Sequence, residues 1–307
     1  MDSVIRTDLR VIAKRFIPNP DNAQIAIEAP GEGPGFWVGA SSAVEVDGTI
    51  YIAYRVRQPI ELGRGQGVVI AKSTDGVHFE TICTIDKTKM DAESLERPTL
   101  VYTPEGKWRL YLSCATTGTK HWRVELLEAN DPSKFYPETR ITVLPGDEHW
   151  GVKDTVIQFH DGLWHLWATM HPLDVKDAED RMQTDYATSV DGIEWEWQGT
   201  ALAPTADSTW DSRGTRLTAV HFTPDGLVAF YDGRASAEEN YDERTGIALG
   251  KAPGSFESVT KDGPVAQSPN SKALRYLDIV PMKDGRVRLF YEIAKPDGSH
   301  ELRTELR

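Results

Sequence analysis

The sequence predicts an all-β protein, a five-bladed β-propeller with four-stranded antiparallel blades, as a single domain over residues 1–307. The first observation is a set of five turns in which an acidic residue precedes glycine, each between two apolar or alternating runs. This dipeptide indicates a hairpin because glycine adopts positive φ without a Cβ clash. The second observation is their spacing of 56 to 64 residues, a period typical of propellers and solenoids. The turns are Asp47-Gly48, Glu105-Gly106, Asp161-Gly162, Asp225-Gly226 and Asp284-Gly285.

A second set of turns sets the number of strands in each blade. In the first four periods, another turn follows the first after 26 to 30 residues, so each blade holds two hairpins and therefore four strands. These turns are Asp75-Gly76, Asp131-Pro132, Asp191-Gly192 and Pro253-Gly254.

The fifth blade is expected to be completed from the other end of the chain. The sequence stops at residue 307, before a second turn, so His300 to Arg307 is the third strand of that blade. We expect Leu9 to Ile17 to supply the missing outer strand. Pairing the N-terminal strand with the last blade would close the ring and remove an open sheet edge.

Composition limits the partners. The formal net charge of −13 makes generic binding to nucleic acid or to an anionic membrane unexpected. The first residues are interrupted by charges and contain no apolar core of a signal peptide, and no apolar run approaches the length of a membrane span. The two cysteines, Cys83 and Cys114, fall in different predicted blades, which favours a reducing compartment. We therefore expect a cytoplasmic protein, with its oligomeric state left open.

A propeller brings distant segments together around its axis. If the acidic-glycine turns lie on one face, the innermost strands begin, and the second strands end, on the other face. Their residues would form a central funnel, the usual place for a ligand. Six carboxylates fall in these segments, and paired carboxylates can perform acid and base work on a glycosidic bond. We expect catalysis from Asp154 and Glu96 first, and from Asp278 and Asp232 next; Glu93 and Glu292 complete the set.

The same segments are rich in arginine, whose planar fork binds carboxylate, phosphate or sulfate. The alternative is that the arginines only hold the inward carboxylates in place. The arginines are Arg55, Arg57, Arg97, Arg213, Arg216, Arg234 and Arg275.

Aromatic residues add possible sugar-stacking surfaces. Trp37, Trp150 and Trp210 each precede an innermost strand, although packing between blades would explain each one equally well. His121, His149 and His171 have no metal-ligand spacing, so no metal and no cofactor is expected, and only a metal ion at the funnel base is left open. Expected to contact the substrate are Arg97, Arg216, Arg234, Arg275, Trp37, Trp150, His171, Arg55, Tyr276 and Glu292.

Two short motifs suggest a family. Ser73 to Phe79 reads SxDGxxF and Ser189 to Trp195 reads SxDGxxW, which resemble the outer hairpins of sugar-cleaving propellers. Together with the five hairpins, nearly the whole chain resembles the five-bladed propeller glycosidases, glycoside hydrolase families 43, 62, 32, 68, 117 and 130. The resemblance implies a central funnel and hydrolysis by carboxylates, or phosphorolysis in family 130.

The sequence also departs from that pattern. Those families commonly carry an aspartate three positions before the apolar pair of an innermost strand. Here no acid stands in that position, and acids appear one or two residues away, at Glu96, Asp154 and Asp278. Either a bulge shifts the register locally, or the acids of a divergent branch are rearranged. The residues in the position are Ala40, Arg97, Lys153, Arg216 and Tyr276.

Three functional hypotheses follow. The first is a glycosidase that acts on a small oligosaccharide, which could be anionic. The second is a lyase for oligouronates or a glycoside phosphorylase that uses the same funnel. The third is a propeller that binds sugar without catalysis.

Overall fold

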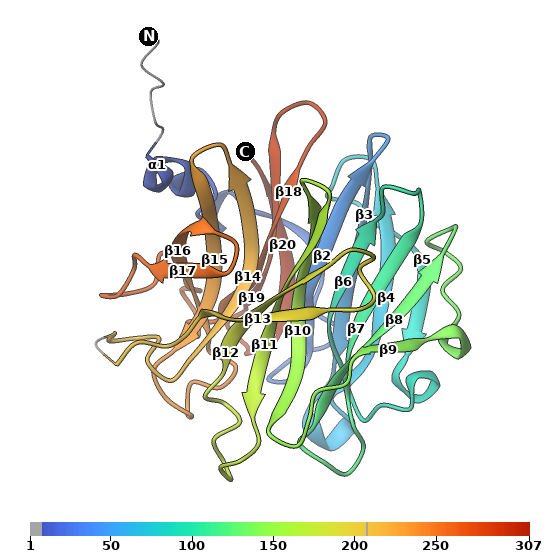
Figure 1. Cartoon of the computed structure of the whole chain (residues 1–307), viewed down its shortest axis with the longest axis horizontal. Coiled ribbons are helices and arrows are strands. Elements are labelled where there is room, and N and C mark those ends of the chain that lie inside the picture. The colour runs from blue at the N-terminus through green and yellow to red at the C-terminus, as the bar shows by residue number, and fades with distance from the viewer. Residues whose placement is uncertain (1–7, 207) are drawn as a thin grey trace.

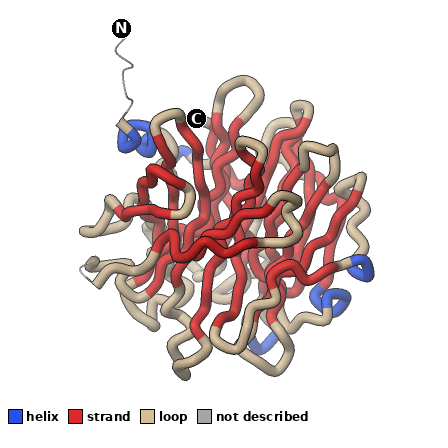
Figure 2. Tube along the Cα trace, viewed as in Figure 1, coloured by secondary structure: helices blue, strands red, loops and turns tan. Residues whose placement is uncertain are grey.

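The computed structural model describes residues 8–206 and 208–307. Strands make up most of the molecule, and the few short helical segments lie at its periphery (Figures 1 and 2). Three blades are separate four-stranded antiparallel sheets. The other two belong to one eight-stranded sheet, in which a single parallel pair, Trp37 with His300, joins the first blade to the fifth. The five-bladed, four-stranded architecture predicted from the turns is confirmed.

The strand bounds are as follows. Blade 1 contains β2 (Trp37–Val46), β3 (Thr49–Arg57), β4 (Gly65–Ser73) and β5 (Glu80–Asp86); blade 2 contains β6 (Leu95–Tyr102), β7 (Trp108–Ala115), β8 (Trp122–Ala129) and β9 (Ile141–Leu144). Blade 3 contains β10 (Trp150–His160), β11 (Leu163–Pro172), β12 (Gln183–Ser189) and β13 (Glu196–Leu202); blade 4 contains β14 (Gly214–Thr223), β15 (Gly226–Arg234), β16 (Arg244–Ala252) and β17 (Ser255–Ser258). Blade 5 contains β18 (Leu274–Pro281), β19 (Val287–Ala294) and β20 (His300–Leu306), with β1 (Gln24–Ile27) paired to β20. The helical segments are α1 (Leu9–Lys14), η1 (Pro20–Asn22), η2 (Ile60–Leu62), η3 (Lys87–Met90) and η4 (Pro137–Thr139).

Each predicted acidic-glycine turn connects the first and second strands of a blade. In the first blade Asp47 and Gly48 have φ of 50° and 78°, and in the third Asp161 and Gly162 have φ of 49° and 81°. Two successive residues with positive φ match the right-handed twist of the flanking strands, which explains the choice of aspartate and glycine here.

The strand predicted at Leu9 to Ile17 is wrong. Residues 9–14 form the helix α1, whose N-cap Asp8 accepts a hydrogen bond from the Arg10 amide. The helix α1 lies beside β15 (Figure 1). Ala13 and Phe16 are buried in one cluster with residues of β15 and its neighbours. The strand beside β20 comes instead from β1, which pairs antiparallel with it and places Gln24 opposite Thr304.

The two SxDG motifs fix contacts between neighbouring blades. In each one, the aspartate accepts backbone amides of its own turn and the serine hydroxyl accepts the glycine amide. A residue of the preceding blade then donates to a carbonyl of the turn: Arg288 to Asp75 at 2.7 Å, and Tyr111 to Gly192 at 2.8 Å. The hydrophobic core lies between blades in the same way, as where Ile70 of β4 packs in one cluster with Leu110 of β7.

Every innermost strand carries a bulge at the same level. The register with the second strand shifts after Gly39, Leu95, Lys153, Leu217 and Arg275. The first extra residue in blades 1, 3 and 5 is left-handed: Ala40, Asp154 and Tyr276 have φ of 49°, 51° and 54°.

These bulges explain the displaced acids. Glu96 and Asp154 occupy the same bulge position in their blades as Ala40 and Tyr276 do in theirs. A bulge re-aims side chains near the end of a strand. The local register shift considered above is therefore present in all five blades.

Candidate active site

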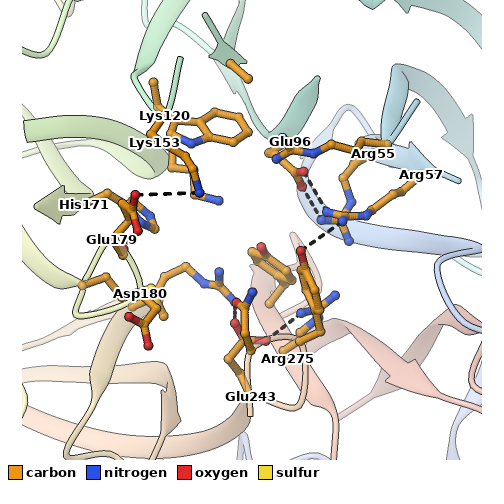
Figure 3. Close-up of a pocket in the computed structure, with 18 of the residues that line it drawn as sticks. Arg55, Arg57, Glu96, Lys120, Lys153, His171, Glu179, Asp180, Glu243 and Arg275 are labelled. Carbon is orange, nitrogen blue, oxygen red and sulfur yellow. Dashed lines mark hydrogen bonds and ion pairs between the residues drawn. The ribbon is translucent and has the colours of Figure 1, made fainter. Parts of the chain in front are cut away.

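A cavity of about 430 Å³ opens at the end of the axis where the innermost strands begin, and we call it the funnel. Side chains from all five blades line it, and Figure 3 shows several of them surrounding one opening. Each blade contributes at least one predicted residue: Arg55, Glu96, His171, Arg216 with Arg234, and Arg275 with Tyr276. The position of the funnel agrees with the prediction from strand direction.

The funnel wall is more cationic than anionic, although the protein is acidic. Three aromatic residues, Trp122, Tyr241 and Tyr276, lie among the charged ones. The cationic side chains are Arg55, Arg57, Arg64, Lys120, Lys153, Arg216, Arg234 and Arg275, and the carboxylates are Glu93, Glu96, Glu179, Asp180 and Glu243.

Arg55 bridges two carboxylates on one side of the funnel. Its guanidinium lies 2.5 Å from Glu96, and that of Arg57 lies 3.1 Å from the same carboxylate (Figure 3). The Arg55 guanidinium also lies 2.7 Å from Glu292. Burial alone would raise the pKa of Glu96, but Arg55 and Arg57 outweigh it and hold that pKa well below its usual range. Glu96 is therefore ionised, which suits a base or a charge stabiliser and not a proton donor.

Glu243 connects three arginines on another side. Its carboxylate oxygens lie 2.6 Å from Arg275, 3.3 Å from Arg234 and 3.8 Å from Arg216. Burial opposes ionisation, but these arginines hold the pKa of Glu243 well below its usual range. The positive charges of the arginines neutralise the carboxylate, so the fold can accommodate this charge although Glu243 is only 2% exposed.

Asp154 is buried in the funnel floor, beneath the lining residues. Its Oδ2 lies 3.2 Å from Arg216 and 3.6 Å from Lys153, and its Oδ1 has no hydrogen-bond partner. Arg216 also binds Asp232 at 2.7 Å. Burial raises the pKa of Asp154, but Lys153 and Arg216 lower it further than burial raises it.

His171 lines the funnel as a neutral imidazole. Its Nδ1 donates to the carbonyl of Glu179 at 2.7 Å, so Nε2 is the unprotonated nitrogen of the neutral ring. Nε2 is buried without a partner, and His171 lines the cavity. Burial, with Lys153 nearby, lowers the pKa of His171 to about 3, so the ring is neutral at physiological pH.

Several predicted residues do not line the funnel. Arg97 and Asp278 line a second cavity of about 400 Å³, formed by the later parts of the innermost strands. Burial raises the pKa of Asp278 to about 6. Trp150 lines a separate outer pocket with residues of β9 and β13.

Three other predicted residues support the lining from behind. Asp232 and Glu292, both fully buried, hold Arg216 and Arg275. Trp37 stacks on His300 and packs against Tyr241, a funnel residue, with 5.0 Å between the ring centroids.

Sequence reasoning missed the residues between the second and third strands. Trp122, Glu179, Asp180, Tyr241 and Glu243 all lie in or beside these connections. The signal was present, because a connection that leaves the end of a second strand must start on the funnel face. The chain also carries its longest hairpin interval, Asp161 to Asp225, where the Glu179 loop is inserted.

Within residues 8–206 and 208–307, no group of three or more histidine, cysteine or acidic side chains could hold a metal ion. The same described part contains no helix long and apolar enough to cross a membrane.

Comparison with known proteins agrees with the fold. Residues 153–280 match the family model of the N-terminal domain of glycosyl hydrolases family 32. No curated protein has a significant match to the sequence.

Three solved structures illustrate the structural likeness. One belongs to the GH130 family of mannoside phosphorylases, and it has a TM-score of 0.66 at 18% identity, over 92% of this chain and 93% of that one. That family contains glycoside hydrolases that target β-1,2 mannosidic linkages in Candida mannan. A thermostable family-43 glycoside hydrolase has a TM-score of 0.70 at 14% identity, over 92% and 91%. A glycosyl hydrolase from Bacteroides ovatus has a TM-score of 0.63 at 16% identity, over 94% and 96%. The chain thus has the five-bladed fold of these propeller glycosidases, and residues 153–280 are also similar in sequence to the family 32 N-terminal domain.

Proposed function

We propose that the protein cleaves the glycosidic bond of a small, negatively charged saccharide inside the funnel. The observation that carries this proposal is the charge of the funnel wall, where eight cationic side chains face five carboxylates in a protein of net charge −13. At the cavity surface an anionic group on the substrate, such as a uronate carboxylate, would meet more cationic than anionic side chains, because the further carboxylates that pair with these cations, Asp154, Asp232 and Glu292, are fully buried behind the lining. Arginine and lysine bind such groups by charge-assisted hydrogen bonds.

Aromatic and acidic residues in the funnel suit the rest of a sugar. Trp122 and Tyr241 add aromatic surface to the lining beside Lys153 and Arg57, and the apolar side of a pyranose could pack against it. Glu96 and Asp154, which the sequence favoured for catalysis, are held ionised and would stabilise positive charge that develops at the anomeric carbon. Arg55, Arg216, Arg234 and Arg275, arranged around the same cavity, would orient the substrate.

Phosphorolysis is the second candidate. The cationic wall would hold inorganic phosphate as well as a uronate, and one of the structural neighbours belongs to a family of mannoside phosphorylases. Elimination of an oligouronate is distinguished by its unsaturated product.

The test is product release from neutral and uronate-containing oligosaccharides, each with and without phosphate. Reducing sugar released from the uronate substrates without phosphate supports the proposal. A requirement for phosphate moves the assignment to a phosphorylase, and ultraviolet absorbance of an unsaturated uronate moves it to a lyase. No turnover of any substrate would refute catalysis and leave a sugar-binding propeller.

A charge-reversal pair tests the role of the wall. Lys120 lines the funnel and its side chain is exposed, so Lys120→Glu should raise KM for an anionic substrate by about tenfold. Lys134→Glu makes the same charge change at an exposed site that does not line the funnel and should leave KM unchanged. Equal effects of the two substitutions would count against binding of the substrate by the funnel cations.

A further inference from the structure

A tyrosine lies at the centre of the funnel floor and contacts a buried carboxylate. The Tyr276 hydroxyl is 3.5 Å from Asp154 Oδ2, and this same oxygen is 3.6 Å from Lys153 Nζ. Tyr276 and Lys153 both line the funnel, whereas Asp154 is fully buried behind them. The three groups form a continuous path for a proton from the phenol to an ammonium group at the cavity wall.

The bulges of the innermost strands create this contact. Asp154 and Tyr276 are the equivalent bulge residues of blades 3 and 5, with φ of 51° and 54°. Because the two residues hold equivalent positions in different blades, their side chains meet near the axis although they are 122 residues apart in sequence. A left-handed conformation is uncommon for a bulky aromatic residue. A smaller residue would fit the backbone better than tyrosine does at this position.

Guanidinium groups surround the Tyr276 ring. The guanidinium carbon of Arg216 lies 3.9 Å from the ring centroid, that of Arg275 lies 5.4 Å away and that of Arg55 lies 5.5 Å away. Burial raises the pKa of Tyr276, so the resting group is a neutral phenol. The surrounding positive charges would stabilise a phenolate that develops only while the hydroxyl attacks.

The funnel carboxylates are poorly suited to attack an anionic sugar. Glu96 and Glu243 are bound to arginines at 2.5 Å and 2.6 Å, which reduces the nucleophilicity of their oxygens. A carboxylate would also meet the negative charge of the substrate at close range, where Coulomb repulsion is largest. A neutral tyrosine avoids this repulsion, and tyrosine is an established type of covalent nucleophile.

Resting on the proposed function, we infer that Tyr276 is the nucleophile of the reaction and that Asp154 is its base. The phenol oxygen forms a bond to the anomeric carbon as the bond from that carbon to the leaving oxygen breaks. The phenol proton passes to Asp154, and the leaving oxygen takes a proton from Lys153. Asp154 then returns a proton to Lys153, which restores both charges. Water cleaves the tyrosyl glycoside by the reverse transfers, so the product keeps the anomeric configuration of the substrate.

The experiment is to trap the covalent intermediate. Both anomers of a 2-deoxy-2-fluoro uronosyl fluoride are incubated with the full chain. The fluorine at C2 slows both formation and hydrolysis of the intermediate, whereas the fluoride leaving group speeds only its formation, so the intermediate accumulates. Intact-mass analysis should show one added 2-deoxy-2-fluorouronosyl group, and peptide mapping should place it on Tyr276. Tyr276→Phe should form no adduct and lose at least about a thousandfold in kcat/KM. Tyr136→Phe, at an exposed site outside the funnel, should behave as wild type.

Two controls separate this inference from the proposed function. Tyr276→Phe keeps the aromatic ring among the arginines, and an unchanged thermal unfolding transition shows that the variant is folded. Turnover by the wild type with an inverted product, with an adduct on another residue, or with full activity in Tyr276→Phe would overturn the tyrosine nucleophile and leave the proposed function intact. Absence of turnover on every substrate would overturn both.

Discussion

Glu243→Gln should destabilise the protein by about 3 kcal/mol, at the lower end of the range for removing one partner from a buried ion pair. The residue is 2% exposed and lies 2.6 Å from Arg275 and 3.3 Å from Arg234. Glutamine preserves the shape of the side chain but leaves these guanidiniums without their shared counter-charge. The cost stays near the lower end because Arg275 retains a second partner, Glu292, at 2.8 Å.

Urea unfolding of the wild type and the variant measures this difference. Glu128→Gln is the matched control, because Glu128 pairs with Arg109 at 2.9 Å and its side chain is 38% exposed. Loss of such a pair should cost less than about 1 kcal/mol. Equal losses in the two variants, or a loss below about 1 kcal/mol for Glu243→Gln, would refute the view that Glu243 neutralises the arginines.

The pH dependence provides a second readout of the same pair. The pKa of Glu243 is lowered in the folded protein, so the stability that its charge contributes is complete above the ordinary glutamate pKa of 4.5 and decreases as the pH falls below it. The unfolding free energies of wild type and Glu243→Gln should therefore converge in acid. A constant difference down to low pH would contradict the assignment.

Three further substitutions test other features of the structure. Arg288→Ala removes the hydrogen bond to the Asp75 carbonyl between two blades and should cost about 1–3 kcal/mol in urea unfolding; an unchanged midpoint would show that the contact adds no stability. Burial raises the pKa of Asp278 from 3.8 to about 6, so the stability of the protein should fall as the pH rises between these values. Asp278→Asn should remove that fall in a pH series of thermal melts. An identical profile in the variant would argue against a shifted carboxyl pKa. Gly39→Ala would place a Cβ 2.6 Å from Glu292, so it should lower the melting temperature and kcat/KM together; a silent substitution would mean that the funnel floor can move.

The sequence was sufficient to predict the blades because hairpin turns are local. An aspartate and a glycine determine the backbone of a two-residue turn with no help from the rest of the fold, so the five hairpins could be located from residues such as Asp47 and Gly48. The helix α1 was mistaken for a strand although its pattern was visible. Leu9, Ile12 and Phe16 repeat at helical spacing and pack in one cluster, and this period should have outweighed the need for a missing strand.

The site was less predictable because its contacts join distant segments. Arg55 and Glu292 are 237 residues apart, and no local pattern indicates which arginine meets which carboxylate. Position along a strand showed that Glu96 and Asp278 both lie on innermost strands. Strand position alone did not show that the bulge separates the two carboxylates, so that Glu96 lines the funnel and Asp278 lines the second cavity.

The pairing of β1 with β20 also affects the order of events during translation. Gln24 leaves the ribosome early but has to wait for its partner Thr304, which is synthesised 280 residues later. The edge of β1 is therefore unpaired while the other blades form, and contacts so distant in sequence slow the final step of folding. During this interval a nascent chain would present an open strand, the kind of edge at which chains associate and which chaperones protect.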